Sequence, residues 1–191
     1  MNDICLNKVS KAYGEKPVLQ NFSAVLPAGG RVALMGPSGQ GKTTLARLLM
    51  GLEKPDSGSI EGAAGLRFCP VFQEDRLCEG FSALQNVALV LPRTARAGIA
   101  AALAATGLLQ EDIYKPVRLL SGGQRRRVAL VRALEAAGEV VVLDEAFKGL
   151  DGAAMQSCFA YVRAALGGRT LLVVTHSAEE AGALCSQTLV L

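Results

Sequence analysis

Tryptophan is absent from this sequence, and aromatic residues make up only 5% of its 191 positions. Because half of the residues are nevertheless hydrophobic, the interior has to be built mainly from alanine, leucine and valine. Interiors of this kind are typical of α/β proteins, whose buried parallel strands are near-continuous aliphatic runs. The length suits one domain with a single sizeable core. We therefore expect one α/β domain over residues 1–191.

The five cysteines are odd in number, scattered along the chain and never arranged as C-x-x-C. This pattern argues against a zinc site and against a disulfide framework. No apolar run is long enough to span a bilayer, and the N-terminus lacks the charged-then-apolar pattern of a signal peptide. We therefore expect a cytoplasmic protein, whose role at a membrane, if it has one, comes through a partner.

The net charge is only +3, so neither positive nor negative residues are in large excess. A balance of this kind does not by itself indicate a nucleic-acid partner, and we expect none. The one local basic cluster is Arg125-Arg126-Arg127. We interpret it as a solvated helix face.

The most informative segment is a glycine-rich loop at residues 36–43, which matches the phosphate-binding loop pattern at every fixed position. A buried strand is predicted before it and a helix after it, so the helix dipole points at the anion. The glycine N–H groups can converge on phosphates, Lys42 can reach the β- and γ-phosphates, and the Thr43 hydroxyl can ligate Mg²⁺. The sequence therefore predicts binding of a nucleoside triphosphate with Mg²⁺. The residues expected to line the site are Gly36, Pro37, Ser38, Gly39, Gln40, Gly41, Lys42, Thr43 and Thr44.

Three kinds of periodicity divide the chain. Residues 4–26 alternate between polar and apolar and are interrupted by turn signals, which predicts an N-terminal antiparallel β-subdomain. From about 74 to 134 the pattern predicts a helical insert; the helix expected at 97–109 lacks a basic face, so packing within the domain is favoured over a membrane surface. After the insert, strand and helix alternate, which predicts a mostly parallel core sheet. The expected helices are 81–91, 97–109, 121–134 and 153–165, and the later strands are 140–143 and 170–174.

A second glycine-rich segment, Leu120-Ser121-Gly122-Gly123-Gln124, stands immediately before a predicted helix. Its hydroxyl, its glycine N–H groups and the helix N-terminus make a second anion site. Because the chain has one phosphate loop, we expect this second site to serve the nucleotide of another copy. Here the sequence resembles the ATP-binding cassette family, whose signature is LSGGQ, and the resemblance covers essentially the whole chain. It implies ATP as the nucleotide.

The hydrophobic run 140–143 ends directly in Asp144 and Glu145, and this resembles the Walker B strand of the family. Two acids directly after a buried strand emerge where ligands bind, which argues against a merely solvated strand end. The resemblance implies that Asp144 holds Mg²⁺ through water and that Glu145 is the general base or orients the attacking water. Gln73 matches the Q-loop glutamine that contacts Mg²⁺ and that water, although a glutamine after a strand is usually only a polar loop residue.

Three further residues take their roles from the resemblance. His176, the only histidine, ends a strand as the family's switch histidine does, although a single histidine is often structural. Asp151 matches the D-loop and is expected near the opposite protomer. Tyr13 matches the aromatic that stacks on adenine, although a tyrosine in an exposed turn is common. The catalytic residues implied are Lys42, Gln73, Glu145 and His176.

The sequence departs from the family pattern at Ala146, where proline is usual, and at Ser177, where aspartate is usual. Neither residue replaces a group assigned to chemistry, so we expect hydrolysis to survive. The sequence also ends about one strand after His176, whereas typical members continue with further strands and helices. We therefore expect a C-terminally short cassette that lacks the accessory region.

Residues 72–77 resemble the Q-loop region of importer ATPases for nitrate, sulfonate and taurine. This resemblance implies an ATP-hydrolysing subunit that energises a bacterial ABC importer from the inner face of the cell membrane. Its partners would be permease subunits docked beside this segment, a substrate-binding protein, and a second identical or paired cassette that dimerises with ATP.

Two other functions are weighed against the importer. A soluble cassette ATPase acting on nucleic acid or the ribosome usually carries coiled-coil inserts, tandem cassettes or basic linkers, and this sequence has none. A small-molecule kinase has no reason to carry LSGGQ. The importer is therefore the leading hypothesis.

Overall fold

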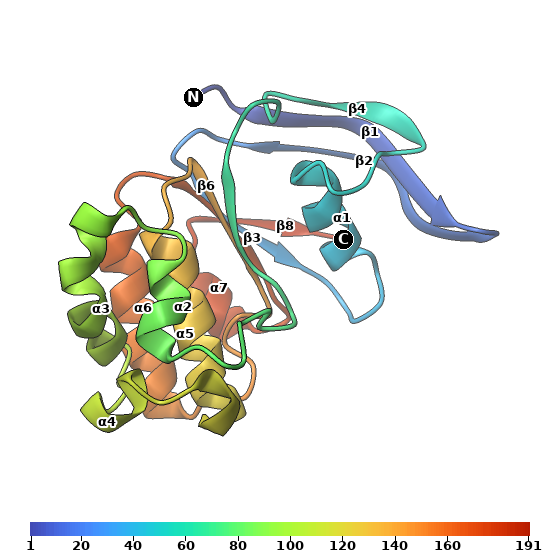
Figure 1. Ribbon diagram of the computed structural model, residues 1–191. Coiled ribbons are helices and arrows are strands. Elements are labelled where there is room, and N and C mark those ends of the chain that lie inside the picture. The colour runs from blue at the N-terminus through green and yellow to red at the C-terminus, as the bar shows by residue number, and fades with distance from the viewer. The chain divides into compact units, whose positions relative to one another are not determined.

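Segments that are far apart in the sequence combine into two units (Figure 1). The computed structural model describes residues 1–191. The first, here called the sheet unit, contains Met1–Phe68, Gly138–Asp144 and Gly168–Leu191. The second, here called the helical unit, contains Cys69–Ala137 and Glu145–Gly167. That both units form a single cassette domain stays a prediction.

The alternating N-terminal segment forms an antiparallel sheet, as its periodicity predicted. Its strands are β1 (Ile4–Tyr13), β2 (Lys16–Leu26) and β4 (Ser57–Glu61), in the order β2-β1-β4. A bulge interrupts the register of β1 between Leu6 and Val9, and Lys8 within it has a φ of 49°. The bulge shifts the inward-facing positions from even to odd residue numbers, so both Leu6 and Val9 are buried.

Four parallel strands of this unit lie in the second sheet. They are β6 (Val140–Asp144), β7 (Thr170–Val174), β3 (Arg31–Met35) and β8 (Gln187–Val190), in that spatial order. All residues of β6 and β7 are buried, as unbroken aliphatic runs predict for central parallel strands. The expected fold class, a mostly parallel sheet with an N-terminal antiparallel sheet, is confirmed.

One apolar core joins the two sheets to α1 (Lys42–Leu49), which contacts β6 and β7 (Figure 1). α7 (Ala178–Leu184) contacts β3 and β7. Leu45, Leu48 and Leu49 of α1 are at most 3% exposed. Because α1 and β3 are both fixed in this core, the glycine-rich loop between them is held at both ends.

Helices build the helical unit, which the chain enters through β5 (Phe68–Val71). They are α2 (Ala83–Ala88), α3 (Ile99–Ala105), α4 (Gln110–Ile113), α5 (Gly122–Glu135) and α6 (Gly152–Ala165), with 3-10 turns at Arg93–Gly98 and Val117–Leu119. α5 contacts α2, α3 and α6, and its Val128 and Val131 belong to the apolar core of the unit.

Two helices are shorter than the pattern predicted. The helix expected at 81–91 is α2, which begins after Ser82 because the Ser82 hydroxyl accepts from the N–H of Gln85, and the Gln85 side chain accepts from the N–H of Ser82. The helix expected at 97–109 is α3, which is preceded by a 3-10 turn and followed by Gly107 at a φ of 81°. A left-handed glycine ends a helix at little cost.

Helix α6, the helix expected at 153–165, lies in the helical unit. It contacts α3 and α5, and its Phe159 is fully buried. The Phe159 ring meets the Phe147 ring edge-on, with centroids 4.9 Å apart and an interplanar angle of 73°. The helical unit is therefore larger than the insert expected at 74–134.

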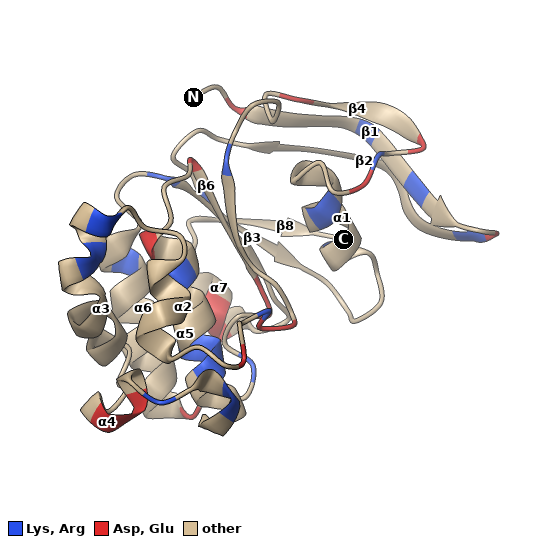
Figure 2. Ribbon diagram, viewed as in Figure 1, with Lys and Arg blue, Asp and Glu red and all other residues tan.

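Charged residues of both signs occur along the chain, but single elements differ in sign: α5 is mainly basic, whereas α4 and α7 carry only acidic residues (Figure 2). No helix combines the length and the apolar character that crossing a bilayer requires.

Replacing Phe159 by alanine should lower the free energy of unfolding by about 3–5 kcal/mol, because a fully buried ring is lost and a cavity is left. The exposed control Ala160→Ser on the same helix should change it by less than about 0.5 kcal/mol. Urea unfolding of both variants measures the difference. Similar values for the two would mean that α6 is not anchored through this ring.

Candidate functional site

The glycine-rich loop connects β3 to α1, and two of its residues have backbone conformations that only glycine adopts easily. Gly39 and Gly41 have φ values of 83° and 93°, and Gly41 is the N-cap of α1. A β-carbon on Gly41 would lie 2.7 Å from Val18 Cγ1 and 2.9 Å from the Val18 oxygen. The loop therefore packs directly against β2, and its exposed part is residues 37–40.

Lys42, the first residue of α1, is 6% exposed and turns its ammonium into the loop. Its Nζ donates to the oxygens of Gly36 and Pro37 at 2.6 and 2.9 Å. An ammonium group has three donors, so this positioned charge keeps the capacity to bind an anion. Thr43 is half-buried and Thr44 is 9% exposed on the first turn of the same helix.

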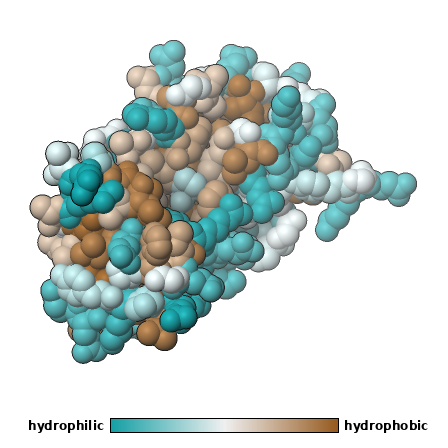
Figure 3. All heavy atoms as spheres, in the orientation of Figure 1, coloured by the Kyte–Doolittle hydropathy of each residue, from teal (hydrophilic) through white to brown (hydrophobic).

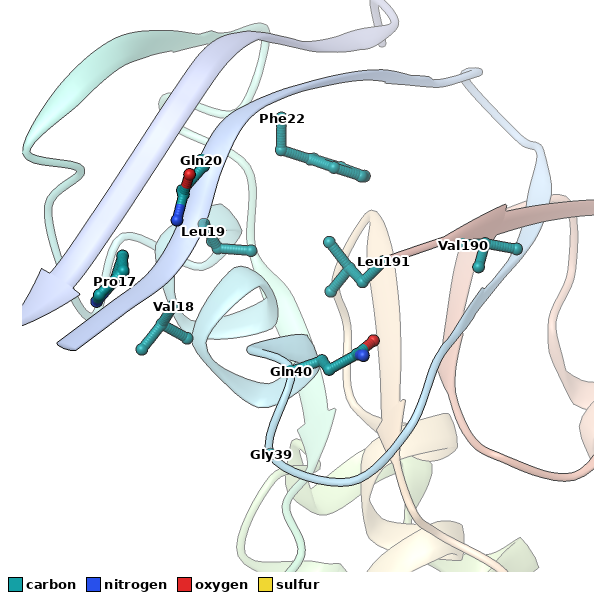
Figure 4. A pocket seen from close by; sticks show the side chains of 9 residues that line it. All are labelled: Pro17, Val18, Leu19, Gln20, Phe22, Gly39, Gln40, Val190 and Leu191. Atoms are coloured by element: carbon teal, nitrogen blue, oxygen red, sulfur yellow. The ribbon is translucent and has the colours of Figure 1, made fainter.

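A cavity of about 460 Å³ adjoins the loop (Figure 4). It is lined by Gly39 and Gln40 of the loop, by residues 17–20 and Phe22 of β2, and by Val190 and Leu191. Figure 4 shows the side chains of Phe22, Leu191 and Gln40 arranged around this space. The cavity thus gives the loop an open and largely apolar side.

Tyr13 ends β1 with its side chain exposed, and several polar groups fix it. Its hydroxyl donates to Glu53, whose other oxygen accepts from Arg47 at 3.4 Å. Lys11 Nζ lies 5.8 Å from the centre of the Tyr13 ring. Lys11 also donates to Asp56 at 2.8 Å, and this bond raises the pKa of Lys11 and lowers the pKa of Asp56. The ring is therefore exposed but anchored.

The other candidate residues of the sheet unit lie at the carboxyl ends of its parallel strands, where ligands bind in open α/β sheets. Asp144, 4% exposed, ends β6 and pairs in register with Val174, the last residue of β7. His176 follows β7 by two residues and is exposed. Thr43 and Asp144 offer hard oxygen ligands, and no cluster of three or more His, Cys, Asp or Glu residues is present. Such a sparse oxygen set fits Mg²⁺, which is usually completed by water and substrate phosphate.

In the helical unit, Gln73 and Lys148 both donate to Glu145. Gln73 Nε2 and Lys148 Nζ each lie 3.4 Å from Glu145 Oε2. Glu145 is half-buried and has a φ of 48°, a left-handed conformation that is strained for a residue with a side chain. Strain of this kind often accompanies functional groups. The structure thus brings together two of the residues that the resemblance assigned to hydrolysis.

The signature segment forms the first turn of α5 through a capping box. Ser121 Oγ accepts from the N–H of Gln124 at 3.2 Å, and Gln124 Oε1 accepts from the N–H of Ser121 at 2.8 Å. Gln124 Nε2 donates to Asp112 of α4 at 2.6 Å. Ser121 and Gly122 are exposed, whereas both ends of the Gln124 amide are engaged inside the chain. Gln124 is therefore placed to fix the turn.

Gly123 allows the signature turn to approach the D-loop. A β-carbon at Gly123 would lie 3.2 Å from the Gly149 oxygen and 3.4 Å from Leu150 Cδ2. Two residues further on, Asp151 is exposed and caps α6 by accepting from the N–H of Ala154 at 2.8 Å. Asp151 therefore has a structural role in its own chain, and its expected place near an opposite protomer stays a prediction.

Sequence reasoning missed the partners of the basic cluster, and the interpretation of Arg126 as a solvated residue is wrong. The Arg126 side chain is 11% exposed, and its Nε lies 3.2 Å from Asp75 Oδ1. Arg127 donates to the oxygens of Gly123 and Thr106 at 3.3 and 3.2 Å. A run of three arginines gives no sign of which members point inward, because the answer depends on non-local carbonyl and carboxylate groups.

The sequence profile of the ABC transporter family matches residues 19–148, from β2 to Lys148. The chain belongs to the ABC transporter family. The phosphate loop, Gln73, the signature turn and the two acids at the end of β6 all lie inside the matched range of this cassette.

The cassette is similar to curated importer subunits. It is 41% identical over 194 aligned residues to the aliphatic sulfonates import ATP-binding protein SsuB 1 of Paraburkholderia xenovorans, covering 97% of this chain and 56% of that protein. It is 42% identical over 190 residues to SsuB of Ralstonia nicotianae, covering 95% of this chain and 66% of that protein. The chain therefore spans between about half and two thirds of the length of these relatives.

Solved cassettes have the same fold. A dimeric post-hydrolysis structure of the ATP-binding cassette MJ0796 bound to ADP and Pi superposes with a TM-score of 0.85 at 26% identity, covering 98% of this chain and 94% of that one. A bacterial Atm1-family ABC exporter with ATP bound gives 0.82 at 27% identity, covering 100% of this chain and 37% of that one.

Replacing Gly41 by alanine should lower the free energy of unfolding more than replacing Gly39. Either alanine would occupy a left-handed conformation, at a cost of about 1–2 kcal/mol. Only at position 41 would the new methyl group also press on Val18, since nothing lies within 4 Å of a β-carbon at Gly39. Urea unfolding of the two variants compares them. Equal losses would show that the loop does not pack against β2 as described.

Proposed function

We propose that this cassette is the ATP-hydrolysing, energy-coupling subunit of a bacterial ABC importer. The observation that carries the proposal is the pair of anion-binding segments in one chain: a phosphate loop with a buried lysine, and an exposed signature turn at the start of α5. Family membership and the likeness to sulfonate import ATP-binding proteins support it. The proposal extends to the transported substrate, which we expect to be of the sulfonate, taurine or nitrate type.

ATP would be held by the loop residues 36–44, with its phosphates on the N–H groups at the start of α1 and on Lys42. Tyr13 would stack on adenine, because its ring is exposed while Glu53 holds its hydroxyl. Thr43 and Asp144 would hold Mg²⁺, helped by Gln73. When bound, this ion would neutralise charge between the β- and γ-phosphates.

Hydrolysis would use Glu145 to hold and deprotonate the attacking water. Gln73 already donates to the Glu145 carboxylate, so this amide would orient both the carboxylate and the water. Lys42 and His176 would stabilise the charge that develops on the γ-phosphate. Ala146 and Ser177, which differ from the usual family residues, provide none of these groups.

Two cassettes would enclose two ATP molecules, each between the phosphate loop of one protomer and the signature turn of its partner. Ser121 Oγ accepts one bond within its own chain, which leaves its O–H to donate to a phosphate across the interface. The N–H groups of Gly122 and Gly123 would add to that contact, Gln124 would fix the turn, and Asp151 would lie near the seam. Phosphate release would then open the dimer.

A permease would bind the cassette and place it at the inner face of the membrane, with a substrate-binding protein completing the system. Figure 3 shows hydrophobic residues, in brown, on the face of the molecule that it draws. The helical unit supports this proposal, because it exposes large apolar side chains. They include Phe81, Leu89, Val90, Leu109, Tyr114 and Leu119. Asp75 is turned inward to Arg126, so docking would rely on these apolar groups and less on that carboxylate.

Replacing Glu145 by glutamine should reduce ATP hydrolysis by about a hundredfold, because the general base is lost. ATP binding should persist, since Lys42 and Asp144 are unchanged, and the variant should accumulate as an ATP-bound dimer. Phosphate release and light scattering with ATP and Mg²⁺ measure both effects. The control Glu111→Gln, at an exposed position of α4, should behave like the unmodified chain. Normal turnover in the Glu145 variant would refute its assignment.

Replacing Ser121 by arginine should leave ATP binding to the monomer nearly unchanged but reduce turnover by about a hundredfold, since a group that contacts the phosphate from the partner is lost. Lys42→Ala should be inactive because it loses the cation that its own phosphate loop provides. A mixture of the two variants should regain turnover, because each mixed dimer has one site with an intact Lys42 and an intact Ser121 from different protomers. A mixture that stays inactive would contradict a site shared between protomers.

A further inference from the structure

Arg126 of α5 makes three contacts with residues 72–78, the segment that carries Gln73. Its Nη1 donates to the Phe72 oxygen at 2.8 Å, and its Nη2 donates to the Gln73 oxygen at 2.7 Å. Its Nε lies 3.2 Å from Asp75 Oδ1. The Arg126 and Asp75 side chains are 11% and 18% exposed, so water screens this ion pair less than it screens a pair on the surface.

These contacts take the place of the hydrogen bonds that a helix or strand would provide. Residues 72–78 form neither helix nor strand, so their carbonyl groups need partners from elsewhere. Arg132, also on α5, donates to the oxygens of Asp75 and Arg76 at 3.1 and 2.9 Å, and burial lowers its pKa. Four consecutive or nearly consecutive residues of the segment are thus fixed to one helix by two guanidinium groups.

The segment connects that helix to the candidate catalytic carboxylate. Gln73 accepts from Arg126 through its main chain and donates to Glu145 Oε2 through its side chain at 3.4 Å. Arg126 stands five residues after Ser121 on the same helix, so the signature turn and the guanidinium move together if α5 moves. A chain of direct contacts therefore runs from Ser121 along α5 to Arg126, Gln73 and Glu145.

We propose that Arg126 is a positioning residue that transmits the position of the signature helix to Gln73 and, through Gln73, to Glu145. The proposal rests on the function proposed above. Arginine is required because two separate N–H groups of a planar fork engage neighbouring carbonyls, whereas lysine offers a single ammonium. Arg125 is the natural control, since its side chain is 41% exposed and its only ion pair, with Asp75, spans 3.7 Å.

Arg126→Gln should lower the maximal rate of ATP hydrolysis by about fivefold to thirtyfold, the upper part of the range of such couplings, with little change in ATP affinity. Arg126→Lys should lose nearly as much, because it keeps the charge and loses the fork. Arg125→Gln should change the rate by less than about twofold. Steady-state kinetics and an ATP-binding titration on the whole chain provide these values. Full activity of the lysine variant, or an equal loss at Arg125, would overturn the proposal.

A double-mutant cycle separates positioning from general stability. In a Gln73→Ala background, adding Arg126→Gln should change the rate by less than about twofold, because the route through Gln73 is already interrupted. The same fold loss in both backgrounds would show that Arg126 acts independently of Gln73 and would overturn the proposal.

Hydrogen exchange provides a readout that does not need hydrolysis. Arg126→Gln should speed exchange of the amides of residues 72–78 more than Arg125→Gln does, whether or not the chain hydrolyses ATP. If the unmodified chain is inactive but this difference appears, the proposed function is wrong, whereas the fixing of residues 72–78 by Arg126 is supported. Unchanged exchange in an active protein would contradict the positioning role of Arg126 and leave the proposed function in place.

Discussion

Burial of the central strands is the constraint on which the candidate site depends. β6 and β7 are buried along their whole length, so neither strand can carry an exposed polar group before it ends. Asp144 and His176 consequently emerge together at the carboxyl ends of neighbouring strands. The same core fixes α1 through its leucines, and this fixes Lys42 on its first turn. The aliphatic interior therefore fixes the positions of the charged and polar groups of the candidate site.

In the helical unit, polar groups that form hydrogen bonds within the chain do much of the positioning. Both ends of the Gln124 amide are engaged within the chain, one by the Ser121 N–H and the other by Asp112. Gly123 has no side chain, which allows the Gly149 carbonyl to approach the turn. These interactions leave the Ser121 hydroxyl and the N–H groups beside it at an exposed helix start. A preorganised donor set of this kind does not have to reorganise when an anion arrives.

Glu145 combines a strained backbone with well-defined partners. A left-handed conformation for a glutamate persists only where its surroundings hold it, and here Gln73 and Lys148 both donate to its carboxylate. Gln73 is held in turn by Arg126 from the signature helix. Because Asp144 and Glu145 are consecutive, the chain passes from the sheet unit to the helical unit at the pair of acids. The general base proposed for hydrolysis therefore belongs to the unit that carries the signature.

Elements whose signal is local could be predicted from the sequence. The phosphate loop, the unbroken aliphatic strands and the LSGGQ turn are recognisable because each depends on residue types at fixed spacing, and the fold class and family followed from them. Helix ends were less predictable, because the capping box at Ser82 and the left-handed Gly107 stop helices inside longer apolar patterns. The tertiary structure alone decided that α6 joins the helical unit, since that depends on the partners of Phe159. It also decided that Arg126 turns inward, because the carbonyl oxygens and the carboxylate it meets lie more than 50 residues away in the chain.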